Sequence, residues 1–369
     1  MTDTSQRPAE TARSSGRIVR QANPRNLETP VEHLRSFITP TDQFYIRNHF
    51  STPRLDRAGY RLEITGAVDQ PASLTYDELR ALPVEHRVVT LECAGNGRVF
   101  LDPQAKGVQW ALGAVSTAEW TGVLLADLLA KAGLRPDATE IILEGADRGH
   151  PKEDPKPAGA IAYARSLPLV KALSPDVLLA YQMNGGDLPL EHGFPVRAIV
   201  AGHYGMASVK WLTHIHASPV PFQGYWQTTD YAYWDKQAGH MVRRPLGAMK
   251  PKSIITQPAP YDTVAPGQSC QITGAAWTGE AEIAQVLVST DAGESWGEAI
   301  FLDSMQRHAW RRWSFDWQVP DVPGPCVLMS RAFDSSGAAQ PDKYDPHYCG
   351  YVINQCLKIE VMVAADRQD

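Results

Sequence analysis

Short runs of mostly apolar residues, bounded by turn-forming residues, recur along the first two thirds of the chain. Runs of this kind are typical of strands that are buried in a sheet. Segments with a helical spacing of apolar residues lie between them, so this part of the chain is predicted to be a mixed α/β domain. The predicted strands cover residues 87–92, 140–144, 177–182, 196–200 and 209–216.

Two helices are predicted together with their ends. A Thr-x-x-Glu capping box at residues 75–78 predicts a helix over residues 76–81. A second helix is expected over residues 122–132, with leucines forming the buried stripe. Thr121 is its expected cap, and Gly133 is expected to end it.

The pattern changes between residues 246 and 268, where four prolines interrupt the chain. Beyond this point, alternating apolar and polar residues are separated by turn signals, as in the strands of a β-sandwich. The expected strands cover residues 270–277, 284–289, 310–319, 326–333 and 357–363. We therefore predict an α+β chain in three parts: a polar tail and irregular lead-in at residues 1–40, the α/β domain at 41–245, and the sandwich at 246–369.

The composition excludes several classes of protein. Of the 369 residues, 43% are hydrophobic and 21% are charged, as in ordinary globular proteins. A net charge of −6 argues against a general nucleic-acid binder, and no apolar run approaches the roughly 20 residues that span a bilayer. Residues 1–21 hold neither a secretory apolar segment nor an adjacent Arg-Arg export signal. A cytoplasmic location is therefore expected for the sequence as it stands, and a periplasmic one if an export signal was removed from it.

One of the five cysteines stands out by its context. None of the five forms a C-x-x-C pair, so neither a disulfide framework nor a zinc finger is expected. Cys93 ends an apolar run and opens a loop of small residues that reaches Arg98. An arginine nearby favours the thiolate, which is the form of cysteine that binds metals and suits heavy, high-valent ones. Taken alone, the residues favour a cysteine that is buried and only packs.

Motifs in a fixed order distinguish these interpretations. Phe44-Tyr45-Ile46-Arg47-Asn48-His49 is followed by Cys93-Ala94-Gly95-Asn96-Gly97-Arg98. Further motifs cover residues 113–120, 144–147, 181–185, 192–197 and 208–212. In this order, over about residues 30–363, the chain resembles the sulfite oxidase family. The resemblance implies a molybdopterin-binding α/β domain followed by an immunoglobulin-like dimerisation domain, and hence a homodimer.

The resemblance further implies a cofactor, a molybdenum ion held by molybdopterin and by the thiolate of Cys93. No haem is expected, because the chain before residue 40 is too short for a haem domain and no C-x-x-C-H motif occurs. Arg197 and Lys210 suit the phosphate of the cofactor, although each residue taken singly also fits a surface or turn role. The positions that match cofactor contacts of the family are Phe44, Tyr45, Arg47, Asn48, His49, Cys93, Asp147, His192, Arg197, Ser208, Val209 and Lys210.

A substrate pocket is implied beside the metal. Arg47 and Arg98 match the two arginines that bind an oxyanion, which requires fixed cationic donors. Trp110 matches a pocket tryptophan, and Tyr231 matches a tyrosine that faces the metal. With Cys93, these four residues form the implied catalytic set. Tyr231 alone would equally fit an aromatic packing residue, because other aromatic residues crowd the same stretch.

The implied reaction is the oxidation of sulfite to sulfate, with electrons passed singly to an external acceptor such as a cytochrome c. Two positions depart from the animal enzymes. Gly97 stands where these carry an arginine, and Cys349 stands where a third substrate arginine is expected. The missing charge keeps a reductase of nitrate or of a sulfoxide open as an alternative. A cofactor-binding or interaction protein without catalysis is the remaining interpretation.

Overall fold

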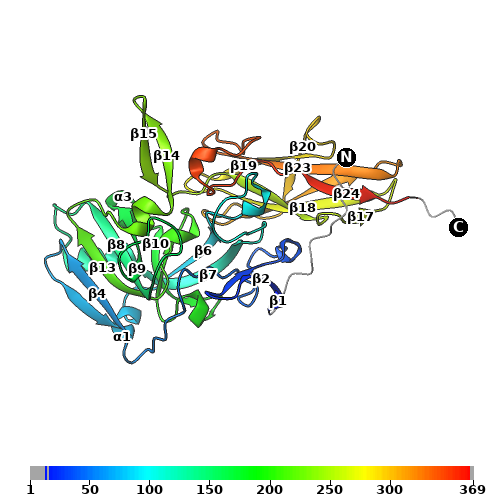
Figure 1. Cartoon of the computed structure of the whole chain (residues 1–369). Helices are drawn as coiled ribbons and strands as arrows, with labels where there is room; N and C mark the ends of the chain where they lie inside the picture. The colour runs from blue at the N-terminus through cyan, green and yellow to red at the C-terminus, as the bar shows by residue number, and fades with distance from the viewer. Residues whose placement is uncertain (1–12, 15, 366–369) are drawn as a thin grey trace.

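The structure is a computed structural model that describes residues 13–14 and 16–365. Two bodies lie side by side, an α/β domain at one end and a two-sheet sandwich at the other, with the first strands between them (Figure 1). The described α-helices are short: α1 (Tyr76–Arg80), α2 (Leu125–Ala132) and α3 (Leu169–Ala172). None of the helices in the described ranges is long and apolar enough to cross a membrane.

The first sheet of the α/β domain carries the cysteine loop. Its strands follow the order β11–β10–β7–β6, and β12 also pairs with β10; every pair is antiparallel. Because Glu92 at the end of β6 pairs with Val115 at the start of β7, Cys93 emerges at an edge of the sheet. The strands are β6 (Glu85–Glu92), β7 (Val115–Leu124), β10 (Val177–Met183), β11 (Gly186–Asp187) and β12 (Arg197–Val200).

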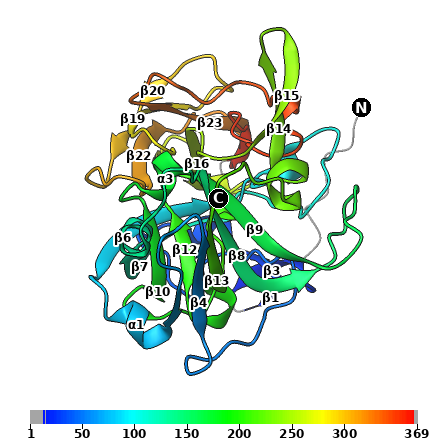
Figure 2. The ribbon, with the colours of Figure 1, turned by 90° about the vertical axis from the view of Figure 1, so that its left-hand side faces the viewer.

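The second sheet of this domain has the order β5–β4–β13–β8–β9, in which only the β13–β4 pair is parallel. Apolar side chains from both sheets and from α2 form one buried core, in which Leu62, Leu129 and Ile215 are fully buried. Figure 2 shows the two sheets below the sandwich. The strands are β4 (Arg61–Gly66), β5 (Ala72–Thr75), β8 (Glu140–Gly149), β9 (Ile161–Pro168) and β13 (Leu212–Ser218).

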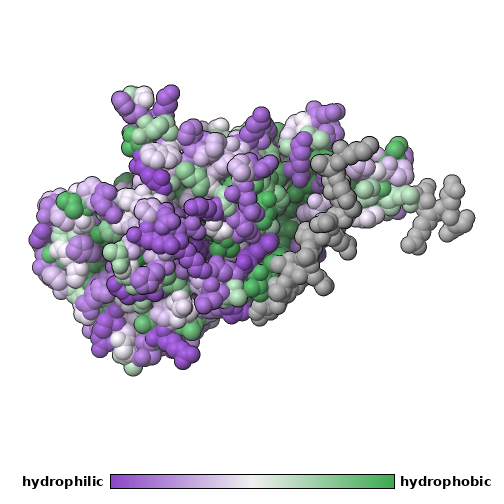
Figure 3. Space-filling model, in the orientation of Figure 1, coloured by the Kyte–Doolittle hydropathy of each residue, from purple (hydrophilic) through white to green (hydrophobic). Residues whose placement is uncertain are grey.

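The C-terminal body is the predicted β-sandwich, which confirms the α+β fold class. One sheet has the order β16–β18–β22–β21 and the other β17–β24–β23–β19–β20, around a core that includes Trp313 and Leu328. On the face shown in Figure 3, the surface over the α/β domain is mostly hydrophilic, and most of the hydrophobic surface lies towards the sandwich. The strands are β16 (Lys252–Gln257), β17 (Thr263–Val264), β18 (Ser269–Trp277), β19 (Ile283–Ser289), β20 (Gly297–Glu298), β21 (Ile300–Phe301), β22 (Arg311–Gln318), β23 (Gly324–Asp334) and β24 (Ile359–Val363).

The segment expected to be an irregular lead-in contains a small sheet of β1 (Arg13–Ser14), β2 (Arg17–Gln21) and β3 (Asn26–Glu28). It is fixed to the α/β domain by Glu28, whose buried carboxylate accepts hydrogen bonds from the N–H groups of Ala111 and Gly113 at 3.1 and 2.8 Å. The prediction of an irregular lead-in is therefore wrong for these residues. Pairing of the strands satisfies backbone groups that would otherwise be buried without partners.

The predicted capping box of α1 is confirmed, since Thr75 Oγ1 accepts from the N–H of Glu78 at 3.1 Å and the Glu78 side chain accepts from the N–H of Thr75. The prediction of the second helix is wrong at its start, because residues 121–124 belong to β7. Gly122 pairs there with Glu85 on one side and Ala180 on the other, so sheet hydrogen bonds outweigh the helical pattern. Gly133, with φ +70°, ends α2 as predicted.

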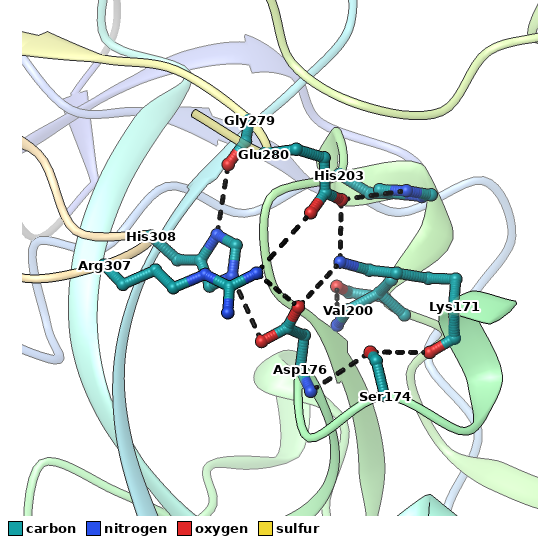
Figure 4. A network of polar contacts seen from close by, with 10 residues as sticks. Lys171, Ser174, Asp176, Val200, His203, Gly279, Glu280, Arg307 and His308 are labelled. Atoms are coloured by element: carbon teal, nitrogen blue, oxygen red, sulfur yellow. Dashed lines mark hydrogen bonds and ion pairs between the residues drawn. The ribbon is translucent and has the colours of Figure 1, made fainter. Parts of the chain in front are cut away.

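A hairpin missed by the sequence analysis projects from the α/β domain near the sandwich (Figure 1). It consists of β14 (Ala232–Gln237) and β15 (His240–Pro245), and every residue of β15 is exposed. Between the two bodies, side chains from both form a polar cluster, which we call the junction cluster (Figure 4). It consists of Lys171, Asp176 and His203 from the α/β domain and Glu280, Arg307 and His308 from the sandwich.

Candidate active site

The cysteine loop begins directly at the end of β6. The N–H of Cys93 donates to Ala114 O at 2.9 Å and extends the pairing of β6 with β7. The Asn96 N–H donates to Cys93 O at 2.8 Å and turns the chain. Cys93 is 6% exposed and lines a cavity. The thiol is therefore held at a fixed place in the wall of that cavity.

Buried polar residues hold this loop from behind. Asn96 Nδ2 donates to Glu92 Oε1 at 3.1 Å, and Glu92 forms a buried ion pair with Lys252 Nζ at 2.7 Å. The indole N–H of Trp277 donates to the other carboxylate oxygen of Glu92 at 2.9 Å. Lys252 and Trp277 belong to the sandwich, so the second domain supports the cysteine loop of the first.

The space in and before the cavity beside Cys93 measures about 650 Å³ with open solvent included, and about 60 Å³ of it is room for the centre of a water-sized molecule. Eleven of the twelve residues predicted to bind the cofactor line it; Val209 does not. Val209 is fully buried and packs beneath the cavity, because it follows a turn that points its side chain into the core. The lining residues that were not predicted are Ile46, Leu91, Ala94, Tyr163, Gly205, Met206 and Trp211.

Buried cations surround one part of this cavity. Arg197 donates to the main-chain oxygens of His192 and Ser208 at 2.9 and 3.1 Å, and burial lowers its pKa to about 10. Lys210 Nζ donates to Glu191 O at 2.8 Å and to Asn48 Oδ1. Burial lowers the pKa of Lys210 and raises that of Asp147 to about 6, because each charge is removed from water. Arg197 keeps its positive charge near pH 7, because its pKa stays well above that value, so this part of the cavity favours an anion.

A second cavity lies on the outer side of the first, and the two share Arg47, His49 and Tyr231 in their walls. We call it the funnel; it encloses about 1470 Å³ and is open to solvent. Arg98 and Cys349 line the funnel as well. The structure thus brings Cys93, Arg47, Arg98 and Tyr231 together around adjoining cavities, as the sequence analysis expected.

Arg98 is held rigidly in the wall of the funnel. It is 5% exposed, its Nε donates to Gly350 O at 2.9 Å, and its Cζ lies 4.8 Å from the centroid of the Tyr351 ring. Glycine makes this possible, because a Cβ on Gly95 would lie 2.4 Å from the same Cζ. The small residues of the cysteine loop therefore make room for a guanidinium group.

Trp110 differs from the prediction. It is fully buried in the cluster that includes Cys93, and it lines neither cavity. Its indole nitrogen has no hydrogen-bond partner among the described residues. The structure therefore places Trp110 in the buried cluster that contains Cys93, and not in the wall of either cavity.

Tyr231 faces the two cavities from a strained turn. Its hydroxyl lies 2.5 Å from His49 Nε2, and its φ is +24°. Burial, followed by the charges of Arg47 and Lys210, lowers the pKa of His49 well below its usual value, and burial raises that of Tyr231. His49 is therefore neutral and Tyr231 is a protonated phenol near pH 7.

Comparison with known proteins agrees with this site. Residues 49–226 match the family model of the oxidoreductase molybdopterin binding domain, and residues 243–364 match that of the Mo-co oxidoreductase dimerisation domain. Chicken (Gallus gallus) sulfite oxidase is 36% identical over 90% of this chain and 75% of its own length. The chain belongs to the sulfite oxidase family.

Other members of the sulfite oxidase family and related enzymes are similar over most of the chain. Rat (Rattus norvegicus) mitochondrial sulfite oxidase is 37% identical over 94% of this chain, which spans 65% of that relative. Nitrate reductase [NADH] 1 of Oryza sativa subsp. japonica is 32% identical over 92% of this chain and 40% of its own. The crystal structure of the sulfane dehydrogenase SoxCD from Paracoccus pantotrophus has a TM-score of 0.82 at 27% identity, covering 99% of this chain and 95% of the other.

The residues in the first cavity fit the molybdopterin group of the sulfite oxidase family. A thiol lies in one wall, and buried cations that donate hydrogen bonds to neutral oxygens lie in others. Asn48 Nδ2 is buried and has no partner within the described part of the chain, so a donor remains for a polar ligand. Thiolate, amide and cationic donors are what the metal, the pterin edge and the phosphate require.

Proposed function

We propose that the protein oxidises sulfite to sulfate at a molybdenum–molybdopterin group bound in the first cavity, and passes electrons singly to an external acceptor. When bound, that group supplies the oxygen-atom transfer and redox chemistry. The observation that carries the proposal is the placement of Arg47 in the wall shared by the Cys93 cavity and the funnel, with Arg98 lining the funnel beside it.

The chain's own residues divide into two groups. Cys93 would be the protein ligand of the metal, and Arg197, Lys210 and His192 would hold the phosphate and the polar edge of the pterin. In the sandwich, Lys252 and its buried ion pair would keep the cysteine loop in place. In this proposal, the predicted domain at residues 41–245 would bind the cofactor, and the predicted domain at residues 246–369 would support the cysteine loop.

On the substrate side, Arg47 and Arg98 would bind the oxyanion and orient its sulfur towards the metal that Cys93 would hold. Two fixed guanidinium groups lower the entropy cost of orientation and balance negative charge on the product. Tyr231 keeps its proton on the phenol oxygen, beside neutral His49, and would donate a hydrogen bond into the pocket. Trp110 would act only by packing in the cluster that contains Cys93.

We further propose an isologous homodimer formed through the sandwich, as the name of the matching family model suggests, and a separate electron acceptor such as a cytochrome c. A cytoplasmic or periplasmic location stays a prediction.

A reductase is the second candidate. The likeness to plant nitrate reductases extends over 92% of the chain, and Cys349 in the funnel supplies no positive charge. Nitrate carries one negative charge and needs fewer cations than sulfite, so a funnel with two anion-binding arginines also suits nitrate.

Steady-state assays of fully metallated protein separate these functions. We expect turnover of sulfite with a one-electron acceptor, and none of nitrate or methionine sulfoxide with a reductant. Cys93→Ser should abolish turnover, whereas Cys356→Ser, which changes a buried thiol in the sandwich, should leave it unchanged. Undetectable sulfite oxidation by the wild type would rule out the proposal, and nitrate reduction in its place would establish the second candidate.

A further inference from the structure

Arg165 on β9 is a buried cation to which neither the cofactor nor the substrate gives a role. It is 2% exposed and lines neither cavity. Its Nη2 donates to Leu246 O at 2.8 Å and its Nη1 to Trp226 O. Within the described part of the chain it forms no ion pair, and its Nε has no partner. Burying a guanidinium group without a negatively charged partner is unfavourable, so the burial of Arg165 calls for an explanation.

The two carbonyl groups that Arg165 binds flank the segment that carries Tyr231. Trp226 lies in the π-helical turn η5 (Tyr225–Thr229) just before Tyr231, and Leu246 follows the projecting hairpin. The N–H of Leu246 also donates to Tyr231 O at 2.8 Å. The peptide groups of Leu246 therefore connect Arg165 to the backbone of Tyr231 through two hydrogen bonds.

Tyr231 needs such support because its backbone is strained. A φ of +24° is unfavourable for a bulky side chain and persists only where the surroundings enforce it. The hairpin that follows Tyr231 adds support only from the surface, since β15 is exposed along its whole length and its Arg243 donates to Thr228 O and Thr229 O at 3.1 and 2.6 Å. Arg165 also places its Cζ 6.0 Å from the centroid of the Tyr231 ring, which is a favourable position for a cation.

We propose that Arg165 is a positioning residue for Tyr231: it clamps the two ends of the segment 226–246 and thereby keeps the Tyr231 hydroxyl on His49, in the wall between the two cavities. This inference rests on the proposed function only for its effect on turnover. The clamp itself is a property of the chain. Arg165 acts through Tyr231 and touches neither substrate nor cofactor.

The test compares Arg165→Met, which keeps an apolar stem but removes the clamp, with Arg165→Lys, which can reach one carbonyl at a time. The control is Arg311→Met in the sandwich, where another partly buried arginine donates to a main-chain carbonyl, Ile283 O, at 3.0 Å. All three variants are made in the full chain.

The first readout is amide hydrogen exchange of the cofactor-free protein. We expect protection of residues 225–246 to fall at least about tenfold in Arg165→Met, because the Leu246–Tyr231 bond opens more often, while other strands of the domain keep theirs. The protection of this segment in Arg165→Lys should lie between that of Arg165→Met and that of the wild type. In Arg311→Met, protection of the segment should equal that of the wild type. Wild-type exchange in Arg165→Met, or an equal rise across the whole α/β domain, would overturn the clamp.

The second readout is the split between kcat and KM for sulfite in the metallated protein. With Arg47 and Arg98 intact, KM should change less than about threefold, whereas misplacement of Tyr231 should lower kcat by about 10- to 100-fold. Partial recovery of kcat in Arg165→Lys is expected. An unchanged kcat would overturn the positioning role.

The two failures are distinguishable. If wild-type protein does not oxidise sulfite, only the proposed function fails, and hydrogen exchange still decides the clamp. If Arg165→Met does not fold, both measurements are made on Arg165→Lys. Hydrogen exchange and kcat equal to those of the wild type in that variant would then overturn the inference.

Discussion

The cofactor cavity and the junction cluster are both rich in buried charge, but they satisfy it differently. In the junction cluster, Lys171 Nζ lies 2.7 Å from Glu280 Oε1 and 3.4 Å from Asp176 Oδ2, and Arg307 lies 3.0 Å from Asp176 (Figure 4). In the cavity, Arg197 and Lys210 have neutral oxygens as their hydrogen-bond partners among the described residues. The first region is complete by itself, whereas the second leaves positive charge for a ligand.

The same contrast explains why the junction cluster is not a second metal site. Asp176, Glu280 and His308 offer ligand atoms within 4.8 Å of one another. The ammonium group of Lys171 already lies between the two carboxylates, and Arg307 reaches both. A divalent cation would have to displace two positive charges. The cluster therefore joins the two domains, and the cavity is the place for chemistry.

The largest effect on stability is expected where a buried charge loses its partner. Lys171→Met leaves Asp176 and Glu280 with less positive charge, so the free energy of unfolding should fall by about 3–5 kcal/mol, measured by chemical denaturation. KM for sulfite should stay at the wild-type value. Lys358→Met, at an exposed lysine, is the control. A wild-type stability would show that the cluster does not join the domains.

In the funnel, loss of a cation should affect binding more than folding. Arg98→Met removes one of two charged donors for the anion, which are worth about 1.5–3 kcal/mol each, so kcat/KM for sulfite should fall about 100-fold, mainly through KM. The fall in unfolding free energy should be smaller than in Lys171→Met. An unchanged KM would remove Arg98 from the substrate site.

A pH effect follows from His203 in the junction cluster. Burial, and then the charge of Lys171, lowers its pKa from 6.5 to about 4, so the unfolded chain binds a proton before the folded one does. Stability from this group is complete above pH 6.5 and is lost as the pH falls towards 4, with a total on the order of 3 kcal/mol. Denaturation at several pH values should show this loss in the wild type and a smaller loss in His203→Gln. If the free energy of unfolding fell equally with pH in the wild type and in His203→Gln, the pH effect would not come from His203.

The smallest effect is expected at the edge of the cluster. Arg307 has a side chain that is 54% exposed, so water screens its ion pairs. Arg307→Met should lower the free energy of unfolding by less than about 1 kcal/mol and leave kinetics unchanged. A loss above about 2 kcal/mol would mean that Arg307, rather than Lys171, carries the cluster.

The sequence predicted those parts of the site that lie within one contiguous motif. Arg47, Asn48 and His49 share a motif and line one cavity, and the alternating pattern after residue 268 predicted the sandwich strands. Residues 122–124 were assigned to the wrong element because two partner strands, distant in sequence, decide their conformation.

Support for the site was harder to predict because it depends on distant partners. Lys252 meets Glu92 across 160 positions, and Arg165 binds main-chain oxygens that carry no side-chain signal. Trp110 fits the motif in sequence, but its burial away from both cavities appears only in the folded chain.

The central claim is that the buried cations near Cys93, whose hydrogen-bond partners among the described residues are neutral oxygens, hold a molybdenum–molybdopterin group. The most direct measurement is the molybdenum and phosphorus content of the full chain purified from cells that make the cofactor. About one of each per chain is predicted for the wild type. Folded protein that contains neither, and takes up neither when the cofactor is supplied, would contradict the account.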